Sequence, residues 1–147
     1  MVKAAHTPRY ALLELARVLL VDDDPASRLT IQTVLQAGGY RVETAASAAE
    51  AVRKMEEDEY ELILSELGLE SPQAGHKVLA HARMMSYRPA AALIRTYRSD
   101  GAAARKSLRP VLIEPDDVPG LLTRVAELIS ERASRRLHRQ MRAAANS

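Results

Sequence analysis

The chain alternates short apolar runs with longer segments in which apolar residues recur at helical spacing. The first run is Arg17-Val-Leu-Leu-Val21, and the later ones lie at 40–44, 61–65, 91–95 and 111–113. Helices are expected at 25–37, 47–57, 76–87, 99–108 and from 116 to about 141. Alternation of this kind is typical of βαβ units, in which helices join parallel strands. The sequence therefore predicts a doubly wound α/β fold with a five-stranded parallel sheet and five flanking helices.

Capping residues support several of these helix boundaries. Asp24 precedes Pro25 and is expected to cap the first helix, which Gly38 and Gly39 end. Ser47 and Glu50 have the spacing of a capping box at the start of the second helix. Met84 and Met85 of the third helix are expected in the core.

Composition excludes several classes of function. The 147 residues suit one domain, and the absence of Cys excludes disulfides, cysteine–zinc sites and thiol catalysis. Aromatic residues make up 3%, all of them Tyr, so nucleic-acid binding by base stacking is disfavoured. The longest apolar runs are strand-sized, so neither a membrane span nor a membrane partner is expected. We expect a cytoplasmic protein.

Acidic residues follow three of the predicted strands. Asp22 and Asp23 follow the first, Glu66 the third and Glu114 the fifth. The carboxyl ends of parallel strands meet at one edge of a sheet, where ligands of such folds bind. Converging carboxylates favour a hard cation such as Mg²⁺, although some of these acids could instead cap helices or face water.

From about Arg17 to Glu131 the sequence resembles the receiver domain of two-component response regulators. The segment Val18-Leu-Leu-Val-Asp22-Asp23-Asp24-Pro25 is similar to the family's first strand and acidic pair. Three later segments resemble its third, fourth and fifth strands: Tyr60-Glu-Leu-Ile-Leu-Ser65-Glu66-Leu67, Ala92-Leu-Ile-Arg-Thr96 and Leu112-Ile-Glu114-Pro115. The resemblance implies a flavodoxin-like sheet with strand order 2-1-3-4-5 and a role in signal transduction or a phosphorelay.

In this family an Asp accepts a phosphoryl group, the acidic pair holds Mg²⁺, and a Lys and a Ser or Thr contact the phosphoryl oxygens. The resemblance places Asp22 and Asp23 at the metal pair and Thr96 at the hydroxyl position. Glu66 occupies the phosphoacceptor position, and it would complete a metal set with Asp22 and Asp23. Glu114 occupies the position of the Lys.

Glu66 and Glu114 change the chemistry that the resemblance implies. The extra methylene of Glu66 moves its carboxylate by about a bond length, and an error of ~1 Å in transfer geometry can cost on the order of a hundredfold in rate. Glu66 could instead mimic a phosphorylated Asp, or mark an unused site. Glu114 replaces a cation with an anion, and four carboxylates in one pocket repel one another. A bound metal, a raised pKa of one acid, or Glu114 turned outward or paired with an Arg would relieve this repulsion, and we favour the last arrangement.

Two further positions depart from the family pattern. Tyr97 follows Thr96 where the family usually has a small residue, so it is expected to cover part of the pocket. Val111 occupies the position of the aromatic residue whose movement reports phosphorylation. Both substitutions favour a receiver that has lost phosphoryl transfer and its readout.

The leading hypothesis is therefore an atypical receiver domain, a pseudo-receiver. It would be no enzyme and would need no cofactor, with Mg²⁺ as the one cation to consider. It would bind a protein partner, independently of phosphorylation, through its fourth helix, fifth strand and fifth helix. The alternatives are a phosphoryl-accepting regulator that uses Glu66 and Mg²⁺, and a nucleic-acid or membrane binder that uses a basic tail.

The domain plan is an N-terminal extension (1–16), a receiver-like domain (17–131) and a basic helical tail (132–147). The segment from Glu131 to Arg142 holds five of the 21 basic residues and one of the 19 acidic residues, so the remainder has 16 basic and 18 acidic residues. An apolar series continues along the last helix, through Leu122, Val125, Ile129, Ala133, Leu137 and Met141. This series suits either a homodimer through the last helix or a solvated extension. No DNA-reading module follows, so a nucleic-acid partner is disfavoured.

Overall fold

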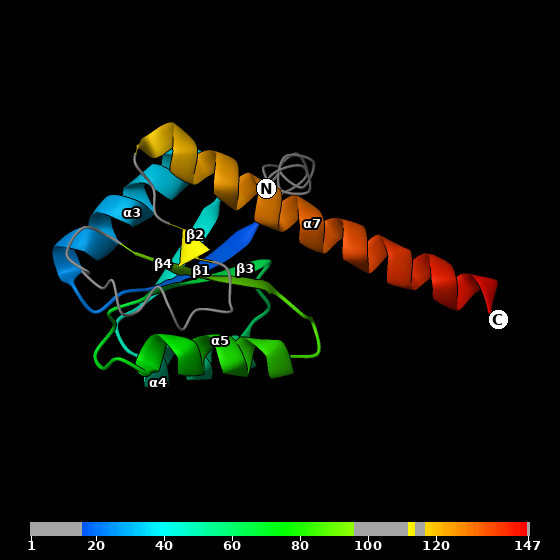
Figure 1. Cartoon of the computed structure of the whole chain (residues 1–147), viewed down its shortest axis with the longest axis horizontal. Helices are drawn as coiled ribbons and strands as arrows, with labels where there is room; N and C mark the ends of the chain where they lie inside the picture. The colour runs from blue at the N-terminus through cyan, green and yellow to red at the C-terminus, as the bar shows by residue number, and fades with distance from the viewer. Residues whose placement is uncertain (1–15, 96–111, 114–116, 147) are drawn as a thin grey trace, which may run out of the picture.

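The computed structural model describes residues 16–95, 112–113 and 117–146, and it contains a five-stranded parallel sheet (Figure 1). The strand order is β2-β1-β3-β4-β5, which confirms the predicted order. Each strand pairs in parallel with its neighbours. The strands are β1 (Arg17–Val21), β2 (Arg41–Ala45), β3 (Leu62–Glu66), β4 (Ala90–Ile94) and β5 (Leu112–Ile113).

Helices cover both faces of this sheet (Figure 1). They are α3 (Pro25–Ala37), α4 (Ala48–Glu57), α5 (Ala74–Met84) and α7 (Val118–Ala145). Helices α3 and α7 bury their apolar residues against one face, and α4 and α5 against the other. The doubly wound α/β class is confirmed. The predicted helix at 99–108 lies outside the described residues, as does the N-terminal extension up to residue 15.

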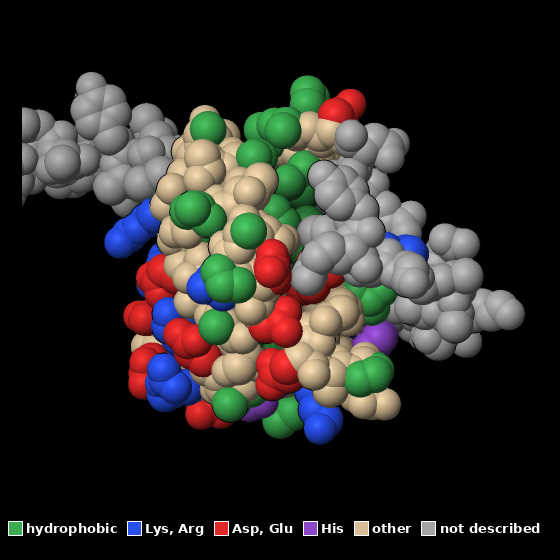
Figure 2. All heavy atoms as spheres, turned by 90° about the vertical axis from the view of Figure 1, so that its left-hand side faces the viewer, with side chains coloured by type: hydrophobic (Ala, Val, Ile, Leu, Met, Phe, Trp, Pro, Cys, Tyr) green, Lys and Arg blue, Asp and Glu red, His purple; other side chains and the backbone are tan. Residues whose placement is uncertain are grey.

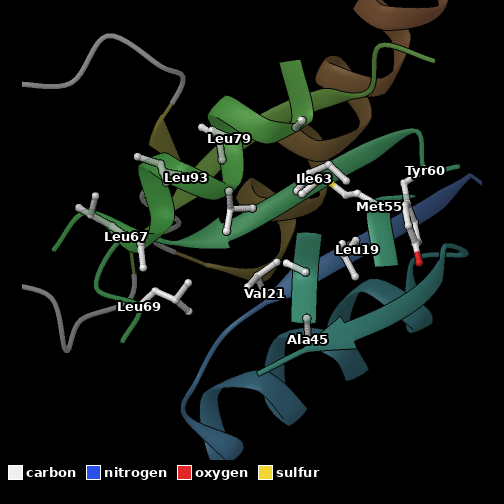
Figure 3. Close-up of a cluster of buried hydrophobic side chains, with 14 residues drawn as sticks. Leu19, Val21, Ala45, Met55, Tyr60, Ile63, Leu67, Leu69, Leu79 and Leu93 are labelled. Atoms are coloured by element: carbon white, nitrogen blue, oxygen red, sulfur yellow. The ribbon is translucent and has the colours of Figure 1, made fainter. Parts of the chain in front are cut away.

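Alternation along the strands creates the two layers of the core. In β1, Leu19 and Val21 pack toward α4 and α5, whereas Val18 and Leu20 pack toward α3 and α7. Successive side chains of a strand point to opposite faces, so a strand buried on both faces is apolar throughout. Figure 3 shows the first of these layers, with Tyr60 at one end and Leu67 and Leu69 at the other.

The predicted cap of α3 is confirmed. The backbone N–H of Ser27 donates to Asp24 Oδ2 at 2.8 Å, which satisfies an amide that the first helical turn leaves without a partner. At the other end, Gly39 has φ of +102°, a left-handed conformation that glycine adopts without steric cost. These two residues fix where the chain enters and leaves α3.

The predicted capping box of α4 is present in a slightly altered form. Ser47 Oγ accepts the N–H of Glu50 at 3.1 Å, and Glu50 Oε1 accepts the N–H of Ala46 at 2.8 Å. The returning hydrogen bond thus comes from Ala46 rather than from the cap residue itself. It lowers the pKa of Glu50, against the opposing effect of burial.

The third described helix, α5, lies about two residues earlier than the sequence predicts. It begins at Ala74 and ends at Met84, and Arg88 adopts φ of +48° before the strand. The prediction that Met84 belongs to the core is wrong, because its side chain is 71% exposed. Met85 does pack against the core, from a partly buried position.

Candidate functional site

The carboxyl ends of β1, β3 and β4 lie at one edge of the sheet. Val21 at the end of β1 pairs with Ser65, and Glu66 at the end of β3 pairs with Ile94. Asp22, which follows β1, and Glu66, which ends β3, therefore lie at the ends of adjacent strands, as the sequence predicts. Figure 2, which views the molecule from the left-hand side of Figure 1, shows acidic side chains on this end.

Asp22 is completely buried, and its carboxylate organises the turn between β1 and α3. Its Oδ1 accepts the N–H of Asp24 at 3.0 Å, and its Oδ2 accepts the hydroxyl of Ser27 at 2.6 Å. The guanidinium of Arg28 donates to its backbone carbonyl at 2.9 Å. Both carboxylate oxygens thus already have donors from this chain.

Asp23 differs from Asp22 in its environment, although the two are neighbours. Its side chain is exposed, and Asp24 beside it serves as the helix cap. The adjacent acids therefore have different positions: one is buried in the turn, one faces solvent and one binds the helix backbone.

Glu66 is the last residue of β3 and is completely buried. The first turn of α5 approaches its backbone closely, because a Cβ at Gly75 would lie 2.9 Å from the carbonyl oxygen of Glu66 and 3.2 Å from Leu93 Cδ2. Gly75, which precedes the helix predicted at 76–87, is thus the residue that lets the helix pack against the strand end. Burial of an ionised carboxylate costs free energy unless a hydrogen-bonding or charged partner compensates for its lost hydration.

The structure does not assemble the predicted metal set of Asp22, Asp23 and Glu66. Within residues 16–95, 112–113 and 117–146, no group of three or more His, Cys, Asp or Glu side chains is arranged to hold a metal ion. Asp22 is engaged by Ser27 and Asp24, and Asp23 is exposed. The side chains of Asp22, Asp23 and Glu66 are therefore not arranged as one three-residue metal set.

Four predicted site residues lie outside the described residues: Thr96, Tyr97, Val111 and Glu114. The predicted four-carboxylate pocket, its covering by Tyr97 and the orientation of Glu114 therefore stay predictions. The described part of the site contains two residues that the sequence analysis missed, Ser27 and Arg28. Their signal is their place in the first turn of the helix that follows the acidic pair, where side chains can reach back to the strand end.

The comparisons with known proteins agree with this geometry. The family model described as "Response regulator receiver domain" matches residues 18–109, more than half of the chain. The chain belongs to the response regulator receiver domain family. Receiver domains act in signal transduction, and they are generally signalling rather than catalytic domains.

Solved structures of receiver domains have the same fold. A CheY-like receiver domain protein from Methanospirillum hungatei is 21% identical, with a TM-score of 0.68 over 82% of this chain and 98% of that one. The chemotaxis regulator CheY4 of Vibrio cholerae is 27% identical, with a TM-score of 0.62 over 78% and 98%. The receiver domain of the histidine kinase PA1611 from Pseudomonas aeruginosa, with magnesium in its active-site cleft, is 23% identical, with a TM-score of 0.64 over 78% and 98%. No sequence among the curated proteins matches this chain.

Proposed function

We propose that this receiver domain transmits signals through protein contacts without accepting a phosphoryl group. The observation that carries the proposal is the complete burial of Glu66, the residue at the phosphoacceptor position. A phosphoacceptor carboxylate must be reached by the phosphoryl donor in line with the bond that breaks. A buried Glu, whose carboxylate is also displaced by one methylene, meets this requirement poorly.

The environment of the acidic pair supports the same proposal. Asp22 has its carboxylate oxygens hydrogen-bonded to Ser27 and Asp24, and Asp23 is exposed. PA1611 shows that a related receiver domain binds magnesium in its active-site cleft. We expect no resident cofactor in this chain, because its described acidic residues do not form such a set. We also expect no catalytic turnover, and a cytoplasmic location stays a prediction from the sequence.

Receiver domains interact with proteins such as kinases and effector domains. We place the partner surface of this chain on β5, on α7 and on the predicted helix at 99–108. Partner binding there is expected to have the same affinity before and after treatment with a phosphoryl donor. In the part of the chain that the structure describes, no helix is long and apolar enough to cross a membrane.

Intact-mass spectrometry after incubation with acetyl phosphate and Mg²⁺ tests the proposal. We expect no phosphoryl adduct on the wild type, because the carboxylate of Glu66 is buried and lies one methylene further from the backbone than that of an Asp. A phosphorylatable receiver domain serves as the positive control. The Glu66→Asp/Glu114→Lys variant restores the family's residue types at both positions. An adduct on this variant would show that these two residues alone account for the absence of phosphoryl transfer in the wild type.

A stoichiometric adduct on the wild type that disappears in Glu66→Gln would contradict the proposal. It would favour the alternative in which Glu66 accepts the phosphoryl group with Mg²⁺ bound at Asp22 and Asp23. In that case Asp23→Ala would also abolish both Mg²⁺ binding and the adduct.

A further inference from the structure

The last helix leaves the domain at the edge of the sheet opposite to the candidate site. In Figure 1, α7 continues to the right beyond the amino ends of the strands. Arg132 is the last buried residue of this helix, and every side chain from Ala133 to Asn146 is exposed. At 1.5 Å per residue, this exposed arm is about 20 Å long.

One side of the arm is strongly basic. Arg135, Arg136 and Arg139 lie three, four and seven residues after Arg132, so helical periodicity places them on the side of α7 that packs against the domain. Arg142 lies three residues after Arg139. We call these four exposed residues the Arg face: Arg135, Arg136, Arg139 and Arg142. No salt bridge in the described part of the chain involves any of them. Arg135, Arg139 and Arg142 line an open hollow together with Ser134 and His138.

The predicted apolar series does not stay on the buried side of α7. Met141 lies sixteen positions after Val125 in the sequence, so at about 100° per residue it lies about 160° around the helix from Val125. Leu137 and Met141 are accordingly 55% and 61% exposed. A partner that contacts the Arg face therefore does not reach these two apolar side chains.

An acidic part of the same domain lies near Arg132, at the base of the arm. The end of α4 and the segment before β3 provide exposed Glu57, Asp58 and Glu59, together with the partly buried Glu61. We call these four residues the acidic edge. Asp58 lies 3.7 Å from Arg17, whereas Glu57 and Glu59 take part in no salt bridge within the described residues.

Arg132 holds the base of the arm against the segment between α5 and β4. Its Nε donates to the carbonyl of Arg88 at 2.9 Å, and its terminal nitrogen donates to the carbonyl of Tyr87 at 2.8 Å. Burial lowers the pKa of Arg132, and the nearby carboxylates of Glu61 and Glu59 oppose that shift. The basic arm therefore starts directly beside the acidic edge.

This juxtaposition determines which partner is complementary. A partner bound beneath the arm contacts arginines along the helix and carboxylates at the base of the helix. Its surface must therefore be acidic where it faces the arm and basic where it faces the acidic edge. A uniform polyanion such as duplex nucleic acid is repelled by the acidic edge. A lipid surface would have to take up Leu137 and Met141, on a side of the helix away from the arginines.

A second copy of the chain has the required pattern. We propose that two copies associate about a two-fold axis, with the Arg face of each arm docked on the acidic edge of the other. Such an interface is isologous, since each copy gives the same two patches. Its pairs are exposed, so association is expected to weaken steeply with salt. This proposal is independent of phosphoryl transfer at Glu66.

Sedimentation velocity across a protein-concentration and salt series tests the proposal. We expect the wild type to dimerise at low salt, and the arm variant Arg135→Glu/Arg139→Glu to dimerise at least about tenfold more weakly. The edge variant Glu57→Arg/Glu59→Arg is expected to lose dimerisation equally. Far-UV circular dichroism checks that helix content is retained.

Mixing the two variants provides the decisive measurement. Each variant repels its own copies, but together they have an acidic arm opposite a basic edge and a basic arm opposite an acidic edge. We therefore expect a one-to-one heterodimer from two monomeric variants. A matched control, Arg53→Glu/Lys77→Glu, changes the net charge as much as the arm variant does, at exposed positions of α4 and α5, and should still dimerise.

Three results would overturn the proposal. The first is a wild type that stays monomeric at low salt, whether or not it binds a duplex DNA probe. The second is a dimer that survives both charge reversals but is lost in Leu137→Gln/Met141→Gln, which would identify apolar helix pairing. The third is a mixture of arm and edge variants that stays monomeric.

Discussion

Ser27 is the residue whose side chain holds the buried Asp22 carboxylate in place. Ser27→Ala removes the 2.6 Å hydrogen bond to Asp22 Oδ2 and leaves a buried carboxylate oxygen without this donor. We expect the free energy of unfolding to fall by about 1–3 kcal/mol, measured by urea denaturation. Thr33→Ala is the matched control, because the Thr33 hydroxyl is exposed and donates only to the carbonyl of Leu29. A loss no larger than that of the control would show that Asp22 does not depend on Ser27.

At the residue scale, the sequence predicts positions better than environments. Asp24 was assigned correctly as a helix cap, because an Asp before Pro at a strand–helix turn has few other roles. Asp22 and Asp23 match the acidic pair of the family, and the structure adds that one is buried and the other exposed. Sequence neighbours at the end of a strand point in different directions, and which of them is buried depends on Ser27 and Arg28 in the next helix.

Helix α7 divides at Arg132 into a part that stabilises the domain and an arm that does not. Every side chain from Ser134 to Asn146 is exposed, so we expect deletion of residues 134–147 to change the free energy of unfolding by less than about 0.5 kcal/mol. Arg132→Ala in the 147-residue chain removes two hydrogen bonds to the carbonyls of Tyr87 and Arg88, and we expect the free energy of unfolding to fall by about 1–3 kcal/mol.

Urea denaturation of the truncated chain and the Arg132 variant measures both effects. Arg136→Ala is the matched control for the substitution, because Arg136 is exposed and lies one turn further along the same helix. A large loss of stability on truncation, with Arg132→Ala neutral, would mean that the arm rather than Arg132 supports the domain.

At the scale of elements, the strands and most helix ends are predictable because they depend on local chemistry. Gly39 and Ser47 fix helix boundaries through backbone conformation or capping hydrogen bonds that involve near neighbours in sequence. The start of α5 lies two residues before the predicted start at residue 76, because Gly75 belongs to the helix. Its role, the close approach to the Glu66 backbone, depends on tertiary packing that no short window of sequence contains.

At the scale of the whole molecule, the parallel sheet follows from strands that are apolar on both faces. Its strand order came from the resemblance to receiver domains, because apolar runs alone do not specify which strands are neighbours. The distribution of charge was only partly predictable. The sequence shows a basic tail and a near-neutral remainder, but only the fold brings Glu59 and Glu61 beside the base of the arm.

The amino edge of the sheet also determines how the stability of the molecule depends on pH. Glu43 accepts hydrogen bonds from Tyr60 at 2.8 Å and from Arg17, whose guanidinium lies 5.0 Å from the centre of the Tyr60 ring. Burial acts to raise the pKa of Glu43, but these partners outweigh it and lower the pKa below 4.5. Burial and the Glu43 carboxylate raise the pKa of Tyr60 well above 10.0, and burial raises that of Tyr87 to about 12.

These shifts predict a plateau of stability with a decline on each side. A depressed carboxyl pKa contributes stability above the unfolded value of 4.5, and this contribution is lost as the pH falls through the folded value. Raised tyrosine pKa values contribute stability below 10.0, which is lost as the pH rises toward the folded values, because only the unfolded chain ionises readily there. Urea denaturation from pH 3 to 11 should therefore show a maximum of the free energy of unfolding between about pH 5 and 9.

Tyr87→Phe should flatten the alkaline decline and leave the acid decline unchanged, since the Tyr87 hydroxyl donates to the carbonyl of Met55 and not to Glu43. Glu43→Gln should flatten the acid decline, and an acid decline as steep as that of the wild type in this variant would show that other carboxylates govern it.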